Sequence, residues 1–216
     1  MKGLTDRVLS FAKADESRVT VRSGVSGFTR TAMNRITTAG NTEDVSIRIT
    51  SAVGKRVASV DTNRVDDRSL EQAVRDSEAL ARLSPENPEY LPEPPAQTYL
   101  DVDGYYGSTG DLTTEDRARS ASLVLERSKA ANTIAAGFID VFAGSQAVAN
   151  RNGLFAYHAS TGVASTLTVR TPDGGSSGWA GDEGGDWTTI ESERIASDAL
   201  AKCQAWRGKT ALEPGT

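Results

Sequence analysis

The sequence predicts an α+β protein built from two similar units, each a helix, about four strands and a second helix. We expect mostly antiparallel sheets with helices packed on one face. Segments of alternating apolar and polar residues, typical of half-buried strands, lie between segments with apolar residues at helical spacing. Glycine contributes 20 of the 216 residues and aromatic residues 6%, a composition typical of strands joined by tight turns. A proline-rich segment divides the chain into parts of similar size.

The first part begins with a helix in which Leu4, Val8 and Phe11 share one face. Four strands are predicted after this helix, at about 18–22, 28–36, 45–50 and 56–60. The third strand has the clearest alternation of apolar and polar residues. The closing helix begins near Asp67, capped by Asp66 or Asp67, and its predicted buried stripe is Leu70, Ala73, Val74, Ser77, Leu80 and Ala81.

The second part repeats this order, with a helix from Thr113 or Thr114 to about Ala131. Its predicted strands are 134–143, 147–150, 154–158, 166–170 and a short one around Trp179. Asn152 and Gly153 predict a hairpin turn between the second and third of them. The closing helix is expected to start at Thr188, with Glu191 in a capping box, and its predicted inner stripe is Ile195, Ala199, Cys203 and Trp206.

Proline spacing predicts the domain boundaries. Five of the seven prolines lie between Pro85 and Pro95, and proline fixes φ and removes a backbone donor, so this stretch should be an extended connector. We expect an amino-terminal α/β domain at 1–84, a linker at 85–105 and a central domain at 106–210.

Charge and cysteine content exclude several classes of protein. The formal net charge is −5 and the isoelectric point about 5.0, which opposes nucleic-acid binding because such binding needs clustered Lys and Arg. The one cysteine excludes an internal disulfide and favours a reducing compartment. The first residues lack the pattern of a secretory signal, and no stretch approaches the length of a membrane helix. The sequence therefore predicts a soluble, cytoplasmic protein.

The glycine-rich segment 173–185 is the most conspicuous local feature. Glycines let backbone N–H groups approach a phosphate, but neither a nucleotide fingerprint nor a following Gly-Lys-Ser/Thr is present. The acidic Asp173, Asp182, Glu183 and Asp186 would repel phosphate. A flexible hairpin loop is the favoured interpretation.

The remaining candidates for chemistry are isolated from one another in sequence. His158 is the only histidine and ends an apolar strand, and Cys203 lies on an apolar helix stripe. A catalytic zinc takes three protein ligands, which this pair does not supply. The acidic pairs Asp66-Asp67 and Asp182-Glu183 are interpreted as caps and loop charges. The residues alone indicate no catalytic, cofactor-binding or metal-binding site.

Three passages carry a resemblance to a known family, in a consistent order and spacing. They are Thr29–Ile36 with Arg30, Ala32 and Asn34; Val45–Ile49 followed by Gly54 and Thr62-Asn63; and Asn152–Leu154 followed by Ser160–Gly162 and 176–181. Together they resemble the TldD/PmbA family, whose members are also called candidate modulators of DNA gyrase. Leu212–Gly215 resembles the entry to the third domain of that family, so 211–216 is expected to be its start.

The resemblance implies a three-part zinc metallopeptidase that acts as a homo- or heterodimer, encloses a chamber and cleaves unfolded peptides. Zinc is expected in the third domain, on a His-Glu-x-x-x-His motif that these 216 residues lack. The chain is therefore expected to be inactive alone. The sequence leaves open whether it is a shortened form or a naturally short member, and whether it belongs to the TldD or the PmbA branch. The alternative is a stand-alone peptide- or protein-binding module, for example a regulator of a topoisomerase.

Overall fold

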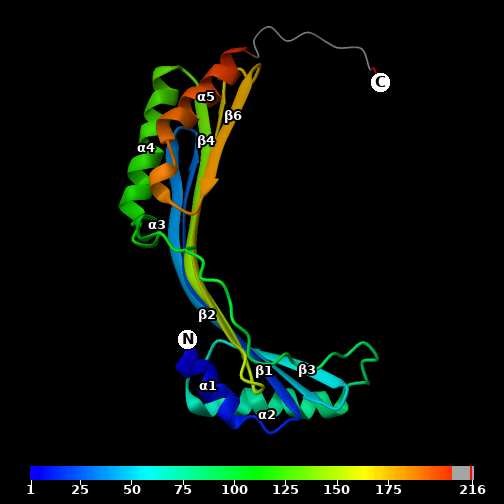
Figure 1. The fold of residues 1–216 in the computed structure, drawn as a ribbon. Coiled ribbons are helices and arrows are strands. Elements are labelled where there is room, and N and C mark those ends of the chain that lie inside the picture. The colour runs from blue at the N-terminus through cyan, green and yellow to red at the C-terminus, as the bar shows by residue number, and fades with distance from the viewer. Residues whose placement is uncertain (206–214, 216) are drawn as a thin grey trace. The chain divides into compact units, whose positions relative to one another are not determined.

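The computed structural model describes residues 1–205 and 215, and its six strands form one antiparallel sheet (Figure 1). The strand order is β3-β2-β1-β4-β5-β6. The elements are α1 (Lys2–Phe11), β1 (Glu16–Ala32), β2 (Arg35–Val53), β3 (Arg56–Thr62), α2 (Asp67–Leu83), α3 (Gly107–Gly110), α4 (Thr114–Ala130), β4 (Ile134–Asn150), β5 (Phe155–Arg170), β6 (Ser177–Gly184), η1 (Trp187–Thr189) and α5 (Ser192–Ala205). The predicted α+β class is confirmed. No helix among the described residues is long and apolar enough to cross a membrane.

The predicted repetition appears in the element order, with three strands per repeat instead of about four. The order α1-β1-β2-β3-α2 is matched by α4-β4-β5-β6-α5, and β2 pairs with β3 as β5 pairs with β6, both antiparallel. The strand count differs because β1, β2, β4 and β5 are each 16 to 19 residues long. Small and polar residues in their middles interrupt the alternation, so the sequence suggested shorter strands.

The predicted strand at 28–36 is wrong, because the chain turns back inside it. Met33 and Asn34 have φ of +51° and +59° and connect β1 to β2. Left-handed backbone is uncommon outside glycine, although asparagine adopts it more readily than most residues. This turn contains neither glycine nor proline, so its sequence lacks the residues that most clearly indicate a turn.

By density of contacts the chain divides into two compact units. The first unit comprises Met1–Val25, Glu43–Gly104 and Gly144–Ser160, and the second comprises Ser26–Thr42, Tyr105–Ala143 and Thr161–Thr216. Each unit therefore takes residues from both sides of the linker, whereas contiguous domains were expected. The long strands explain the difference, since each of them contributes one end to each unit.

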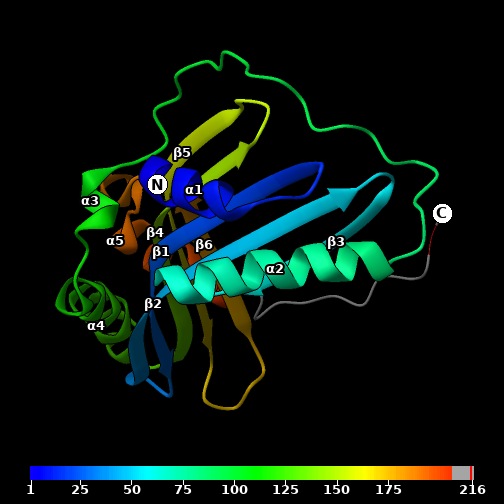
Figure 2. The same cartoon turned by 90° about the horizontal axis from the view of Figure 1, so that it is seen from below.

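The first unit packs α1 and α2 against one face of its strands. Figure 2 shows α2 lying lengthwise beside β2 and β3. Its N-cap Asp66 accepts from the backbone N–H of Ser69 at 3.0 Å, as predicted. Leu80 was expected in the buried stripe but is 48% exposed, and Glu78 is buried instead. The core is Val8, Val19, Val21, Ile47, Ile49, Leu70, Ala73 and Val74.

The second unit packs α4 and α5 against one face of its strands (Figure 1). Thr113 and Asp116 form a capping box at the start of α4, which confirms the predicted start of that helix. The helix expected from Thr188 begins at Ser192, because a 3₁₀ turn at Trp187–Thr189 precedes it. Ile195, Ala199 and Cys203 are buried as predicted. Trp206, the end of the predicted 106–210 domain and the segment Leu212–Pro214 lie outside the described residues.

Candidate functional site

The glycine-rich segment contains the turn between β5 and β6 and then β6 itself. Gly174 has a φ of +72°, and the Asp173 carboxylate accepts from the backbone N–H of Gly175 at 3.0 Å. The backbone N–H of Ser176 donates to Thr171 Oγ1 at 3.1 Å. These hydrogen bonds lie within the turn itself, and they favour the hairpin over a phosphate cradle.

Gly178 in β6 lies where α5 approaches the sheet most closely. A Cβ at Gly178 would lie 2.1 Å from the carbonyl oxygen of Ala199 and 2.5 Å from the backbone nitrogen of Cys203. Both are backbone atoms of α5, which have little freedom to move. Glycine is therefore required at this position for helix–sheet packing, and no ligand is needed to explain it.

The acidic pairs take structural roles. The pKa of Asp66 lies below its usual value because the backbone N–H and side chain of Ser69 hydrogen-bond its carboxylate, as expected of a helix cap. Asp182 forms an ion pair with Arg194 of α5. Both contacts agree with the interpretation of these acids as caps and loop charges.

His158 and Cys203 belong to different units and have different surroundings. Cys203 is 1% exposed inside the core of the second unit. His158 is an exposed residue of β5 in the first unit, where a Cβ at Gly104 would lie 2.7 Å from its Nε2. Among residues 1–205 and 215, no group of three or more His, Cys, Asp and Glu side chains is arranged to hold a metal ion. The donor set of these residues therefore does not fit a zinc site.

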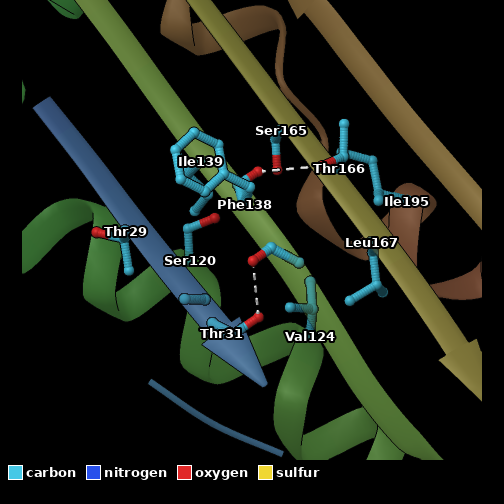
Figure 3. Close-up of a pocket in the computed structure, with 12 residues that line it drawn as sticks. Thr29, Thr31, Ser120, Val124, Phe138, Ile139, Ser165, Thr166, Leu167 and Ile195 are labelled. Atoms are coloured by element: carbon cyan, nitrogen blue, oxygen red, sulfur yellow. Dashed lines mark hydrogen bonds between the residues drawn. The ribbon is translucent and has the colours of Figure 1, made fainter. Parts of the chain in front are cut away.

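A small cavity in the second unit lies between the sheet and its helices, and its lining mixes apolar side chains with the hydroxyl groups of serines and threonines (Figure 3). The Thr31 hydroxyl donates to the carbonyl oxygen of Gly137 at 3.3 Å, whereas the buried hydroxyl of Thr29 has no hydrogen-bond partner among the described residues. The cavity volume is about 10 Å³, and one water molecule needs about 10–15 Å³. This cavity is too small for a peptide side chain.

Arg117 of α4 is a buried cation that the sequence analysis did not single out. Its guanidinium donates to Asn41 Oδ1 at 2.6 Å and to Thr114 Oγ1 at 3.2 Å. Burial lowers the pKa of Arg117 below its usual value, since desolvation disfavours the charged form. A Cβ at Gly27 would lie 2.7 Å from its Nη1, so glycine leaves room for the guanidinium. These contacts assign Arg117 a packing role.

Asn34 joins the β1–β2 turn to the start of β4. Its side-chain Nδ2 donates to the carbonyl oxygen of Thr133 at 2.7 Å, and its Oδ1 accepts from the backbone N–H of Ala135 at 2.7 Å. The amide thus extends the ladder beyond the end of β1. This first passage of the family resemblance has a structural role.

A larger cavity, of about 200 Å³, lies in the first unit beneath the proline-rich connector. Side chains alternate between the faces of a strand, and Ile47 and Ile49 face the helices as part of the core. Thr50 and Ala52 consequently lie on the opposite face, where they form the floor of the cavity with Val57 of β3.

The connector segment 87–93 forms the roof of this cavity and is held at both ends. The backbone N–H of Asn87 donates to the carbonyl oxygen of Lys55 at 2.9 Å. The hydroxyl of Tyr90 donates to Glu16 Oε2, and the backbone N–H of Glu93 donates to the same oxygen at 2.8 Å. Burial and the neighbouring Glu16 raise the pKa of Tyr90 above its usual value, so its hydroxyl remains a donor.

The β4–β5 turn anchors the connector beyond this roof. Asn150 Nδ2 donates to the carbonyl oxygen of Pro94 at 2.7 Å, and Asn152 Nδ2 donates to that of Glu93 at 2.9 Å. Gly153 has a φ of +88°. The predicted Asn152-Gly153 hairpin is confirmed, and the two asparagines hold the connector in place. Because this cavity is much larger than the one in the second unit and its roof is held in place, it is the candidate site of the chain.

Comparisons with known proteins give matches in structure alone. No protein-family model and no curated protein sequence matches the chain. TldE from Thermococcus kodakarensis matches with a TM-score of 0.83 and 17% identity, over 94% of this chain and 47% of that one. A candidate modulator of a DNA gyrase from Thermotoga maritima matches with a TM-score of 0.87 and 14% identity, over 99% and 50%.

A third solved structure agrees with these two. A candidate modulator of DNA gyrase from Bacteroides thetaiotaomicron has a TM-score of 0.83 and 15% identity, over 98% of this chain and 51% of that one. The chain spans about half the length of each solved structure that it matches. The chain thus has the fold of TldE and of these gyrase-modulator structures, and the resemblance in sequence is confirmed at the level of fold.

Proposed function

We propose that the chain belongs to the TldD/PmbA family and forms the non-catalytic front half of a subunit of a zinc metallopeptidase. In this role the two units help to form a chamber around unfolded peptides and associate with another subunit. The observation that carries the proposal is the fold match, which covers 94–99% of this chain and only about half of each other chain. In this proposal, zinc binding and peptide cleavage belong to a part of the subunit that corresponds to the unmatched half of those solved structures.

A zinc and peptidase measurement on the purified 216-residue chain tests the catalytic part. We expect less than stoichiometric zinc after dialysis and no cleavage of an unfolded peptide, because the donor set of the described residues does not fit a zinc site. A full-length TldD-type subunit, assayed in parallel, serves as the active control. Stoichiometric zinc together with turnover in the 216-residue chain would overturn the proposal.

Sedimentation velocity tests the association part independently. We expect the chain to form dimers with itself or mixed complexes with a full-length subunit of the family, in a concentration-dependent manner. A chain that stays monomeric in both experiments would contradict a role in subunit association, even if it proves to be catalytically inactive.

A second candidate function is peptide binding by strand addition. β3 and β6 are the outer strands of the sheet, and an outer strand has unpaired backbone groups that an extended peptide can pair with. Trp179 of β6 is 55% exposed, so its fluorescence should change when a peptide adds to that edge. Calorimetry with unfolded peptides tests the general case, and the absence of heat and of a fluorescence change contradicts it. A gyrase supercoiling assay tests the narrower role of topoisomerase regulator.

A further inference from the structure

The cavity beneath the connector has an excess of negative charge. Its charged lining residues are Glu16, Glu89 and Glu93 against the single cation Arg18. Arg18 Nη1 lies 3.2 Å from Glu93 Oε1, so these two charges balance each other. The other two carboxylates remain without a cation in the cavity.

These two carboxylates differ in their surroundings and lie on different segments. Within residues 1–205, Glu16 of β1 accepts only uncharged donors, the Tyr90 hydroxyl and the Glu93 backbone N–H. Glu89 belongs to the connector, and its carboxylate has no hydrogen-bond or ion-pair partner among residues 1–205. One is therefore fixed on the strand and the other is free on the roof. Both residues line the same cavity.

The volume limits the ligand to a single side chain. Pockets for drug-sized ligands measure about 300–1,000 Å³, and this cavity measures about 200 Å³. Its roof is held at both ends by the hydrogen bonds of Asn87, Tyr90 and Glu93, so little conformational entropy is lost when a ligand enters. The cavity therefore suits one polar head group on a flexible stem.

We propose that this cavity binds the guanidinium group of an arginine side chain in an extended peptide. A guanidinium presents five N–H donors in a planar fork, so one group can serve two carboxylates that approach from different sides. An ammonium group offers a more compact charge and more strongly bound water. Arginine should consequently bind more tightly than lysine. The proposal does not rest on the peptidase assignment, because it concerns the lining of the first unit alone.

Titration of the full 216-residue chain with N-acetyl-arginine methylamide tests the proposal. We expect saturable shifts of the Tyr90 and Glu93 backbone amide signals in ¹H–¹⁵N spectra, with a dissociation constant on the order of millimolar for a single side chain. The citrulline analogue has nearly the same shape without the charge, and it should bind about tenfold more weakly. Equal binding of the two probes, or no saturable shift with either, would overturn the proposal.

A pair of charge-neutralising variants locates the site. Glu89→Gln should weaken arginine binding about tenfold, because it removes the free carboxylate while leaving the hydrogen bonds that hold the roof. Glu71→Gln removes the same charge on α2, which packs on the other face of the sheet, and it should leave the affinity unchanged. If Glu71→Gln weakens binding as much as Glu89→Gln does, the probe senses only net charge and the assignment fails.

Discussion

Replacing Gly178 with alanine tests the packing of α5 on the sheet. The added Cβ would lie 2.1 Å from the Ala199 carbonyl oxygen, 2.5 Å from the Cys203 nitrogen and 2.9 Å from the Lys202 Cβ. Overpacking a well-packed core costs about 1–3 kcal/mol, and here two of the three opposing atoms are helix backbone. We therefore expect Gly178→Ala to lower the free energy of unfolding by about 3 kcal/mol.

Gly162 provides a matched control in the neighbouring strand. It lies in β5, has nothing within 4 Å of an added Cβ and has no positive φ. Gly162→Ala should be neutral or stabilising by about 0.5 kcal/mol, because alanine loses less backbone entropy on folding.

Thermal unfolding followed by tryptophan fluorescence measures both variants, since Trp179 and Trp187 lie in the second unit. For a chain of this size 1 kcal/mol corresponds to about 2–4 °C in Tm, so Gly178→Ala should melt about 6–12 °C below the parent. If it melts within about 2 °C of Gly162→Ala, α5 does not approach β6 as described, and the structural explanation of this glycine is refuted.

Three further predictions concern hydroxyl and carboxyl groups. Thr29→Val should stabilise the second unit by about 1 kcal/mol, because its buried hydroxyl has no partner in the part of the chain that the structure describes. Thr31→Val should instead cost about 1 kcal/mol through a lost hydrogen bond. Chemical denaturation measures the sign of each change in the free energy of unfolding, and equal signs contradict the assignment. Glu78→Ala should lower the free energy of unfolding by about 3 kcal/mol, since the carboxylate accepts hydrogen bonds from two backbone N–H groups. Glu71→Ala removes only an exposed ion pair with Arg75, and it should change stability by about 0.5 kcal/mol or less. Because the pKa of Tyr90 is raised, the folded state retains a proton that the unfolded chain releases above about pH 10. The contribution of Tyr90 to the free energy of unfolding is therefore full below that pH and is lost as pH rises. Tyr90→Phe should flatten this alkaline decline in stability, and an unchanged pH profile would contradict the hydrogen bond to the carboxylate.

Secondary structure was predictable wherever one face of an element is buried and the other is exposed to solvent. The start of α4 at Thr113 and the cap of α2 at Asp66 follow from side chains that satisfy free backbone N–H groups. The alternation around Ile47 follows from a strand with helices on one face only. In such places the local sequence contains the whole physical cause of the local structure.

Prediction failed where a distant contact decides. Nothing near Glu78 in sequence indicates that it is buried, because its partners are the backbone N–H groups of Lys13 and Ala14, more than 60 residues away. Arg117 likewise appears as a surface charge on α4 until Asn41 and Gly27 are brought against it. A helical pattern assigns both residues to solvent, and tertiary hydrogen bonds overrule it.

The candidate site shows the same limit in a sharper form. Proline content predicted an extended connector, and extension is what lets one short segment cross a sheet face. Whether a cavity forms beneath the connector depends on where the connector is attached to the sheet. Glu16 and Asn150, on strands that are distant in sequence, provide those attachments through hydrogen bonds. Glu16 is the decisive residue, because the carboxylate that holds the roof is also one of the two left without a cation. Because the lining of this cavity comes from segments that are far apart in the sequence, no compact motif marks it. The lack of a recognisable catalytic pattern in the sequence is therefore no argument against binding in this cavity.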